Sequence, residues 1–186
     1  MSAHLIVDIQ ISAMLATWLF GSAMAGEPLQ SGAGAGPVVS ICPSGEPGER
    51  LLFSGRVLDY QGNPLSKAAV VAYHADRSGL YNPPRSATRV PRLRAVAITD
   101  EGGRFAFSTI RPGAYPDRSE PAHIHVTVSA PAHHVRHLAY WFDGDPLITD
   151  AGRAQASRNP GTVIVRPILG ENGVWTFVHD VRLEGN

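Results

Sequence analysis

Two histidines separated by one residue give the strongest chemical signal in the sequence. His123 and His125 stand in the run Ala122-His123-Ile124-His125, which has the composition of a β-strand. Residues i and i+2 of a strand project from the same face, so the two imidazoles are aimed together, and imidazole is the commonest metal ligand in proteins. A pair of this kind also occurs on solvated strand faces. The pair alone therefore leaves a metal site and an exposed polar face as alternatives.

A tyrosine precedes this pair on a stiff loop. Tyr115 lies eight residues before His123, in a segment that also contains Pro112, Gly113 and Pro116. Proline and glycine restrict this segment to turn conformations, and a rigid loop is a suitable mount for a functional side chain. The segment therefore favours the metal site over the polar face.

The elements that must position these residues are short strands. Apolar runs that are β-branched or alternating are separated by Gly, Asn and Asp turn residues at strand spacing, and only residues 150–157 suggest a helix. This pattern predicts an all-β fold, an antiparallel β-sandwich core with long active-site loops and little helix. The expected strands cover residues 51–57, 68–75, 93–99, 103–108, 124–129, 137–142, 162–167 and 174–183.

The first 25 residues read as a signal peptide. An apolar stretch at 9–20 is followed by Ala23-x-Ala25, the small-residue pattern of a cleavage site, and the stretch is too short to anchor the chain in a membrane. We therefore expect export to the periplasm or outside the cell, with no membrane span in the mature chain. The segment before the apolar stretch lacks Lys and Arg and carries Asp8, so a later start codon or a cytoplasmic extension are the alternatives.

Composition limits the rest of the interpretation. Residues 26–49 are rich in Gly, Pro and Ser, so we expect a flexible leader before one folded domain at 50–186. The 186-residue chain has 16 basic and 16 acidic side chains, and this balance argues against nucleic acid as a partner. The single cysteine, Cys42, excludes an intramolecular disulfide and a Cys-x-x-Cys metal motif.

Several motifs between residues 51 and 150 together resemble one known family, the intradiol ring-cleavage dioxygenases, and most closely the protocatechuate 3,4-dioxygenase type. The glycine motifs near the start also occur in transthyretin-like and carboxypeptidase-regulatory-like sandwiches, so the tyrosine and histidine motifs are the specific part. Beside the histidine run, the matching segments are Gly55-x-Val57-x-Asp59-x-x-Gly62-x-Pro64, Gly79-Leu80-Tyr81, Thr99-Asp100-x-x-Gly103-x-Phe105-x-Phe107, Thr109-Ile110-x-Pro112-Gly113-x-Tyr115-Pro116 and Trp141-Phe142-Asp143-Gly144-Asp145.

The resemblance implies a ferric iron centre. Its ligands would be Tyr81, Tyr115, His123 and His125. Phenolates are hard anionic donors that suit Fe(III), and the charge of the ion keeps them deprotonated. Tyr73 is a rival for the first tyrosine by sequence distance, but it occupies a strand position where the family usually has Trp, and we interpret it as core or pocket wall.

The same resemblance implies an activity. The partners would be a small catechol-type diol and O2, with both oxygen atoms entering the ring and a cis,cis-muconate-type diacid as product. Tyr115 would leave the iron as the diol binds and accept one of its protons, and no organic cofactor would be needed. The alternative is a transthyretin-like or carboxypeptidase-regulatory-like binding module with a non-catalytic metal site. Either a homo-oligomer or a hetero-oligomer is compatible with the sequence.

The chain departs from the family pattern at two positions. Glu120 stands where the family usually has an Arg that stabilises the negatively charged substrate, and Ala139 aligns with a Gln near the metal. Arg118 and Arg136 are the candidates to replace the missing cation. One more candidate neighbour of the metal is His74, which replaces a Gln on the strand that leads to Tyr81. The carboxylate of Glu120 is the feature that favours the binding-module alternative, because it opposes the charge that the Arg would support.

Overall fold

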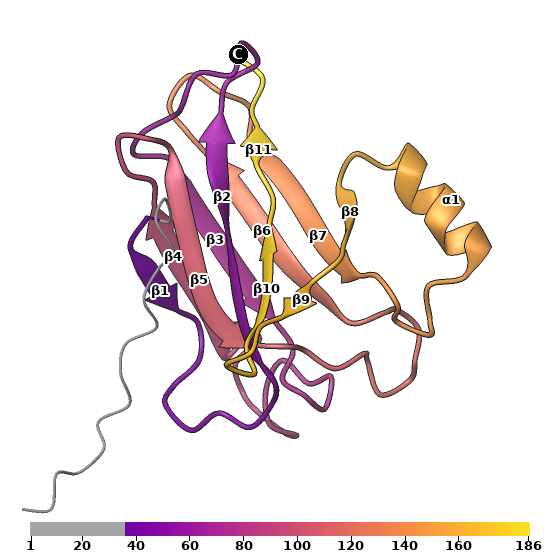
Figure 1. Cartoon of the computed structure of the whole chain (residues 1–186). Coiled ribbons are helices and arrows are strands. Elements are labelled where there is room, and N and C mark those ends of the chain that lie inside the picture. Colours follow the sequence, from indigo (N-terminus) through magenta and orange to yellow (C-terminus); the bar gives the residue numbers. More distant parts are fainter. Residues whose placement is uncertain (1–35) are drawn as a thin grey trace, which may run out of the picture. The chain divides into compact units, whose positions relative to one another are not determined.

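The chain folds into two β-sheets packed face to face (Figure 1). The computed structural model describes residues 36–186, so the expected signal peptide lies outside the described residues. The first sheet has the order β1-β5-β2-β10-β9, with β11 paired to β2, and the second has the order β4-β3-β6-β7-β8. The strands of the first sheet are β1 (Val38–Ser40), β2 (Arg50–Leu58), β5 (Arg104–Ile110), β9 (Ile168–Leu169), β10 (Trp175–Val178) and β11 (Val181–Arg182). Those of the second are β3 (Ala69–His74), β4 (Leu93–Ile98), β6 (His123–Ser129), β7 (Arg136–Phe142) and β8 (Thr162–Val165).

Aromatic side chains fill the space between the sheets. Phe53 stacks on Phe107 and on Phe177 with centroid separations of 5.2 and 5.3 Å, and Tyr140 of the opposite sheet meets it edge-on at 6.2 Å. These rings are buried because strand alternation points every second side chain of β2, β5 and β7 inward. The core therefore joins the two sheets through a few large rings.

The prediction of an all-β sandwich is confirmed, and the sheets are mixed, with parallel pairs beside the expected antiparallel ones. The pairs β2–β5, β3–β4, β3–β6, β6–β7 and β9–β10 are antiparallel, whereas β1–β5, β7–β8, β10–β2 and β11–β2 are parallel. A parallel pair needs a crossover connection. Helix α1 (Asp150–Arg158), capped by the Thr149 side chain on the amide of Gly152, lies in the crossover from β7 to β8 and agrees with the expected helix at 150–157.

The flexible leader that we expected at 26–49 does not extend to the start of β2. Strand β1 lies inside that range and pairs with β5, with Val38 opposite Ala106. Ile41, which directly follows β1, is buried. The apolar residues of Val38-Val39-Ser40-Ile41 bury enough surface to order this segment although the surrounding composition is rich in glycine and proline. The described fold therefore begins at β1.

The outer face of the second sheet carries the histidine pair. On β6, Ile124, Val126 and Val128 point into the core, so His123 and His125 project on the opposite side.

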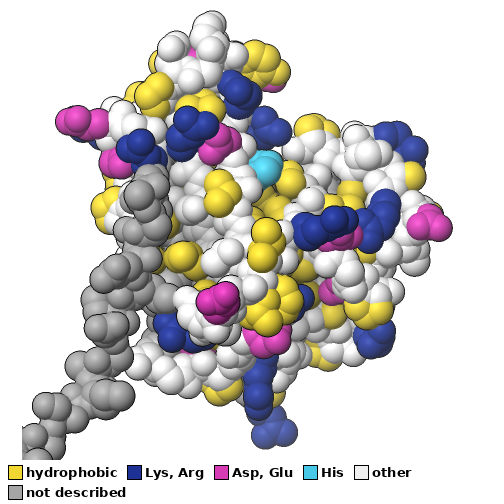
Figure 2. Space-filling model, viewed as in Figure 1, with side chains coloured by type: hydrophobic (Ala, Val, Ile, Leu, Met, Phe, Trp, Pro, Cys, Tyr) yellow, Lys and Arg dark blue, Asp and Glu magenta, His cyan; other side chains and the backbone are white. Residues whose placement is uncertain are grey.

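No helix in residues 36–186 is long and apolar enough to cross a membrane. On the face shown in Figure 2, acidic and basic side chains are interspersed, as the balanced charge of the sequence leads us to expect.

Candidate metal centre

Four donor atoms form a closed ring at one end of the second sheet. The Tyr81 and Tyr115 hydroxyl oxygens are 2.8 Å apart, and Tyr115 Oη is 3.2 Å from His123 Nε2. The ring closes through His123 Nε2 to His125 Nε2 at 3.0 Å and His125 Nε2 to Tyr81 Oη at 3.0 Å. The structure thus brings together all four side chains that the resemblance pointed to.

A tightly bonded turn holds Tyr81 in the loop between β3 and β4. The Asp76 carboxylate accepts hydrogen bonds from the amides of Ser78 and Leu80, and the Asp76 amide donates to the Leu80 carbonyl. On its other side, the carbonyl of Tyr81 accepts a hydrogen bond from the Arg92 amide at 3.0 Å. Tyr81 therefore stands on a fixed backbone between two anchored points.

Glycines let the Tyr81 loop pack directly against the Tyr115 loop. Gly79 has a left-handed φ of +79°, and a Cβ there would overlap the carbonyl of Ala114. From the other loop, a Cβ on Gly113 would overlap the carbonyl of Arg77, and the Gly113 amide donates to the Asp76 carbonyl. The two phenols meet because both backbones approach more closely than a side chain would allow.

The orientation of His123 is set by its own neighbours. Its Nδ1 lies 2.7 Å from the Pro121 carbonyl, and because a carbonyl only accepts, Nδ1 must carry the proton. In the neutral ring this leaves Nε2 as a bare lone pair aimed at the other donors, the arrangement that a metal-binding histidine requires. The Asp145 carboxylate accepts from the amide of Ala122 at 3.0 Å and so holds the start of β6 in place.

Burial favours the neutral form of three of the four donor side chains, Tyr81, Tyr115 and His125, when no metal is present. Burial raises the pKa of Tyr81, and the hydrogen bond with Tyr115 raises it further. Burial also raises the pKa of Tyr115, and the nearby Glu120 carboxylate adds to this rise, while the hydrogen bond with Tyr81 lowers it. Burial lowers the pKa of His125 to about 4, with a smaller effect from His123. The neutral imidazole of His125 and two protonated phenols therefore face one another at pH 7.

The donor set fits a hard, highly charged cation. Two donors that each lie about 2.1 Å from one ion, at right angles, are about 3 Å apart, and the ring edges measure 2.8 to 3.2 Å. Among residues 36–186, no three His, Cys, Asp or Glu side chains are grouped as a metal site, so the histidines reach four donors only with the phenols. Phenolate oxygen is a hard anion that a ferric ion prefers and a softer divalent ion does not.

Three further residues that the sequence suggested as neighbours of the metal, Tyr73, His74 and Ala139, lie on strands β3 and β7. Tyr73, opposite His125 in the β3–β6 register, stacks on the His125 ring at 4.7 Å and forms a wall, as expected. Ala139 faces His125 from β7. His74 points to the other side of β3, is fully buried, and bonds to the Ala75 carbonyl at 2.7 Å and the Thr109 hydroxyl at 2.6 Å. His74 is therefore part of the core and not a neighbour of the ring.

Arg136, one of the two candidate replacement cations, lies far from the ring. Arg136 pairs with Val128, three residues beyond His125 on β6 and roughly 10 Å away at the usual rise per residue. Its guanidinium donates to the carbonyls of Arg182 and Pro160 at the far end of the sheet, so the hypothesis that Arg136 replaces the missing cation does not fit its position.

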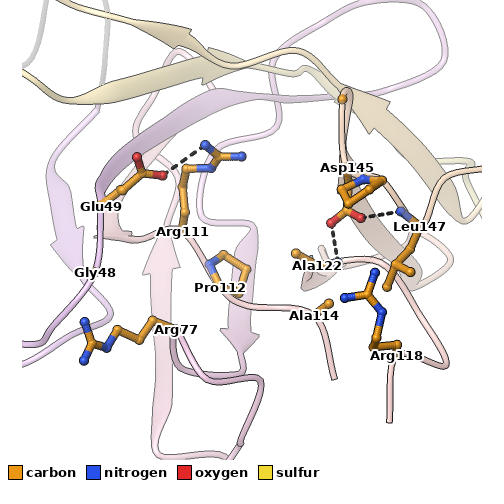
Figure 3. A pocket seen from close by; sticks show the side chains of 12 residues that line it. Gly48, Glu49, Arg77, Arg111, Pro112, Ala114, Arg118, Ala122, Asp145 and Leu147 are labelled. Carbon is orange, nitrogen blue, oxygen red and sulfur yellow. Dashed lines mark hydrogen bonds and ion pairs between the residues drawn. The ribbon is translucent and has the colours of Figure 1, made fainter. Parts of the chain in front are cut away.

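Arg118 lies in a pocket beside the ring-bearing loops. It helps to line a cavity of about 740 Å³ in which Arg111 pairs with Glu49 and Asp145 bonds the amides of Ala122 and Leu147 (Figure 3). None of the four ring side chains is among the residues that line this cavity. Glu120, in contrast, lies near the ring, with Oε2 3.9 Å from His123 Nε2.

The roles of Asp145 and Gly79, which position the ring, were not predicted from the sequence. Asp145 and Gly79 stood in motifs that matched the family, but their functions depend on contacts with Ala122 and Ala114, which lie far from them in the chain. The signal for Gly79 was its place beside Leu80-Tyr81, where a left-handed residue before a ligand indicates a constrained turn.

Comparison with known proteins places this chain in a family. The family profile described as Dioxygenase matches residues 37–183. The chain is 31% identical over 121 residues to catechol 1,2-dioxygenase 2 of Acinetobacter lwoffii, covering 56% of this chain and 44% of that protein. It is 35% identical over 117 residues to the protocatechuate 3,4-dioxygenase beta chain of Burkholderia cepacia, covering 56% and 50%. The chain thus spans about half the length of these curated relatives.

Solved structures show the same fold. Catechol 1,2-dioxygenase from Acinetobacter sp. ADP1 superposes with a TM-score of 0.65 at 26% identity, covering 80% of this chain and 57% of that one. The dioxygenase domain of a dioxygenase carbohydrate-binding protein fusion from Streptomyces sp. SirexAA-E gives a TM-score of 0.61 at 25% identity, covering 87% and 96%. With its profile match from β1 to the last strand, the chain belongs to the intradiol ring-cleavage dioxygenase family.

Proposed function

We propose that this protein is a ferric intradiol dioxygenase that inserts both atoms of O2 into a catechol-type diol to give a cis,cis-muconate-type diacid. The observation that carries the proposal is the closed ring of two phenol oxygens and two imidazole nitrogens with 2.8 to 3.2 Å edges. Relatives named catechol 1,2-dioxygenase and protocatechuate 3,4-dioxygenase beta chain support the reaction class.

Each residue has a defined part in this proposal. His123 and His125 supply neutral nitrogen donors, and Tyr81 and Tyr115 supply phenolates. A ferric ion held by these four side chains would supply Lewis acidity that favours diol binding and activation of the diol toward O2. Tyr115 would take up a diol proton at its Oη, because burial raises the pKa of this phenol and so favours its protonated form. Tyr73 stacks on His125 and limits the movement of that ring.

We also propose that the preferred diol carries no carboxylate. The Glu120 carboxylate lies at the edge of the ring, where it opposes a second negative charge. The ratio of kcat/KM for catechol to that for protocatechuate should exceed one at low ionic strength and move toward one in Glu120→Gln. A wild-type preference for protocatechuate would contradict this part of the proposal.

The colour of the protein loaded with ferric iron tests the proposed metal centre independently of catalytic turnover. The full-length protein, stripped of metal and reconstituted with one ferric equivalent, should turn red-brown through charge transfer from tyrosinate, and the band should shift when catechol is added. O2 uptake should then accompany the appearance of a muconate-type product. Tyr115→Phe is the matched variant, since it keeps the aromatic side chain at this position and loses one phenolate. A wild-type protein that stays colourless with ferric iron would overturn the proposal and favour a non-catalytic binding module.

Location and assembly complete the proposal. We propose that residues 1–25 direct export, which N-terminal sequencing of the secreted or periplasmic protein would test by finding Gly26 as the first residue. One relative is named a beta chain, and we propose that this chain too assembles into a homo- or hetero-oligomer. The mass of the native particle, purified without a partner and from its own cells, distinguishes these two assemblies from a monomer.

A further inference from the structure

One carboxylate lies at the rim of the donor ring without a basic side chain beside it. Glu120 Oε2 stands 3.9 Å from His123 Nε2, and within residues 36–186 this is its one ion-pair contact. Slightly more than half of the Glu120 side chain, 54%, is exposed, so it can rotate without disturbing the core. Glu120 is thus both close to the ring and free to approach it.

The contact between Glu120 and His123 brings together an oxygen and a nitrogen that can both donate a lone pair to a cation. The proton of the His123 ring is on Nδ1, where it is donated to the Pro121 carbonyl, so Nε2 presents a lone pair. A carboxylate at neutral pH also presents only lone pairs. A cation bound between a carboxylate oxygen and an imidazole nitrogen would attract both.

The backbone on either side of Glu120 is held, which limits where the carboxylate can go. Before it, the amide and hydroxyl of Ser119 both donate to the Asp117 carboxylate, at 3.0 and 2.7 Å. After it, the Pro121 carbonyl is bonded to the His123 ring. The side chain is therefore the mobile part, and its oxygen needs to move by about 1 Å to match the 3 Å spacing of the other donors.

We infer that Glu120 is a fifth, anionic donor to the metal centre, bound in the resting protein and displaced when a diol chelates the ion. The inference rests on the proposed function. A ferric ion with two phenolates keeps a net charge of one, which one carboxylate neutralises, and carboxylate oxygen is the same hard class of donor as phenolate. The exposed, rotatable side chain can withdraw as a competing diol binds.

Ferric titration of the metal-free, full-length protein tests this assignment. Wild type, Glu120→Gln and Glu101→Gln are titrated with ferric citrate while the tyrosinate band is recorded. Glu101 is the matched control, because it is an exposed glutamate in the hairpin between β4 and β5 and its change removes the same charge far from the ring. Glu120→Gln should bind ferric iron about 10- to 100-fold more weakly. Its band should lie at longer wavelength, since a weaker donor leaves the ion more electron-poor, and Glu101→Gln should match wild type.

Addition of 4-nitrocatechol, a chelating diol, gives a second readout. The spectra of wild type and Glu120→Gln should converge once the diol is bound, because the carboxylate has then left the ion in the wild type. Equal affinity and an equal band position in the two glutamine variants would overturn the inference while leaving the proposed function intact. Absence of a tyrosinate band from the wild type would overturn the proposed function itself. Thermal unfolding without metal should be the same for all three proteins, which shows that the exposed side chain does not act through stability.

Discussion

The hydroxyl oxygens of Tyr81 and Tyr115 lie 2.8 Å apart although the two residues follow strands of different sheets. Tyr81 is in the loop after β3 of the second sheet, and Tyr115 is in the loop after β5 of the first. The donor ring therefore exists only when the two sheets are packed together. Because ligands that bind only the folded state stabilise it, metal binding should raise the unfolding temperature of the whole sandwich.

Removal of a single phenol hydroxyl, at Tyr81 or at Tyr73, should distinguish a metal ligand from a residue of the pocket wall. In Tyr81→Phe the ring loses an oxygen donor, so ferric affinity should fall by at least about 10-fold and the intensity of the tyrosinate band should fall markedly. Tyr73→Phe is the control, because Tyr73 contacts the centre through its ring face on His125. It should keep the band position and the affinity within about twofold. An unchanged band in Tyr81→Phe would remove Tyr81 from the proposed ligand set.

The close approach of the two loops should depend on Gly79. Gly79→Ala places a Cβ against the Ala114 carbonyl, so it should push the loops apart, destabilise the protein by more than about 2 kcal/mol and weaken ferric binding. Gly173→Ala is the matched control, since φ is +73° there compared with +79° at Gly79, and no atom lies within 4 Å of the added Cβ.

The control should cost about 1 kcal/mol, the strain of a left-handed alanine alone, and should leave ferric binding unchanged. Urea unfolding and ferric titration of both variants measure the two effects. If the two variants lost the same stability and bound iron equally well, the contact between the loops would not position the phenols.

The stability of the metal-free protein should fall in mild acid. The pKa of His125 is about 4 in the folded chain, and burial likewise lowers the pKa of His74, compared with an unfolded value of about 6.5. Between these values the unfolded chain binds more protons than the folded one, so stability is full above pH 6.5 and is lost as the pH falls toward 4.

Urea midpoints measured between pH 8 and pH 4.5 test this dependence. His125→Gln should flatten part of the slope, because it removes one of the groups that the fold keeps neutral. A midpoint that stays constant from pH 6.5 to 4.5 in the wild type would show that neither histidine is kept neutral by the fold.

Asp145 should matter for the metal centre although it is not one of the four donors. Its two oxygens accept from the amides of Ala122 and Leu147, at 3.0 and 2.9 Å, and so tie the start of β6 to the loop after β7. Asp145→Asn replaces one acceptor with an NH2 group that faces a backbone donor. It should cost about 1 to 3 kcal/mol and weaken ferric binding through the displaced His123.

Asp180→Asn serves as the control, because Asp180 pairs with the exposed guanidinium of Arg56 and exposed pairs contribute about 1 kcal/mol or less. Its ferric affinity should equal that of the wild type. Wild-type ferric affinity in Asp145→Asn would show that the Asp145 contact does not orient His123.

Most strands followed from alternation that is local in the sequence. The expected strand at 124–129 is β6 at His123–Ser129, and the one at 93–99 is β4 at Leu93–Ile98. Strands β1 and β9 were not predicted, because they have three and two residues and show too little alternation to be recognised. The parallel strand pairs were not predicted either, since parallel pairing depends on where the chain crosses over and not on the composition of a strand.

The sequence alone determined that His123 and His125 point to the same side, because the two-residue period of a strand is a local property of the backbone. The stiff loop before the histidines indicated Tyr115, and motif resemblance added Tyr81. Only the tertiary structure decided that the four side chains meet in one ring, that Arg136 lies at the far end of the sheet and that Glu120 reaches its rim. These relationships depend on how two sheets pack and how closely Gly79 lets two loops approach, and both arise from contacts between residues far apart in the chain.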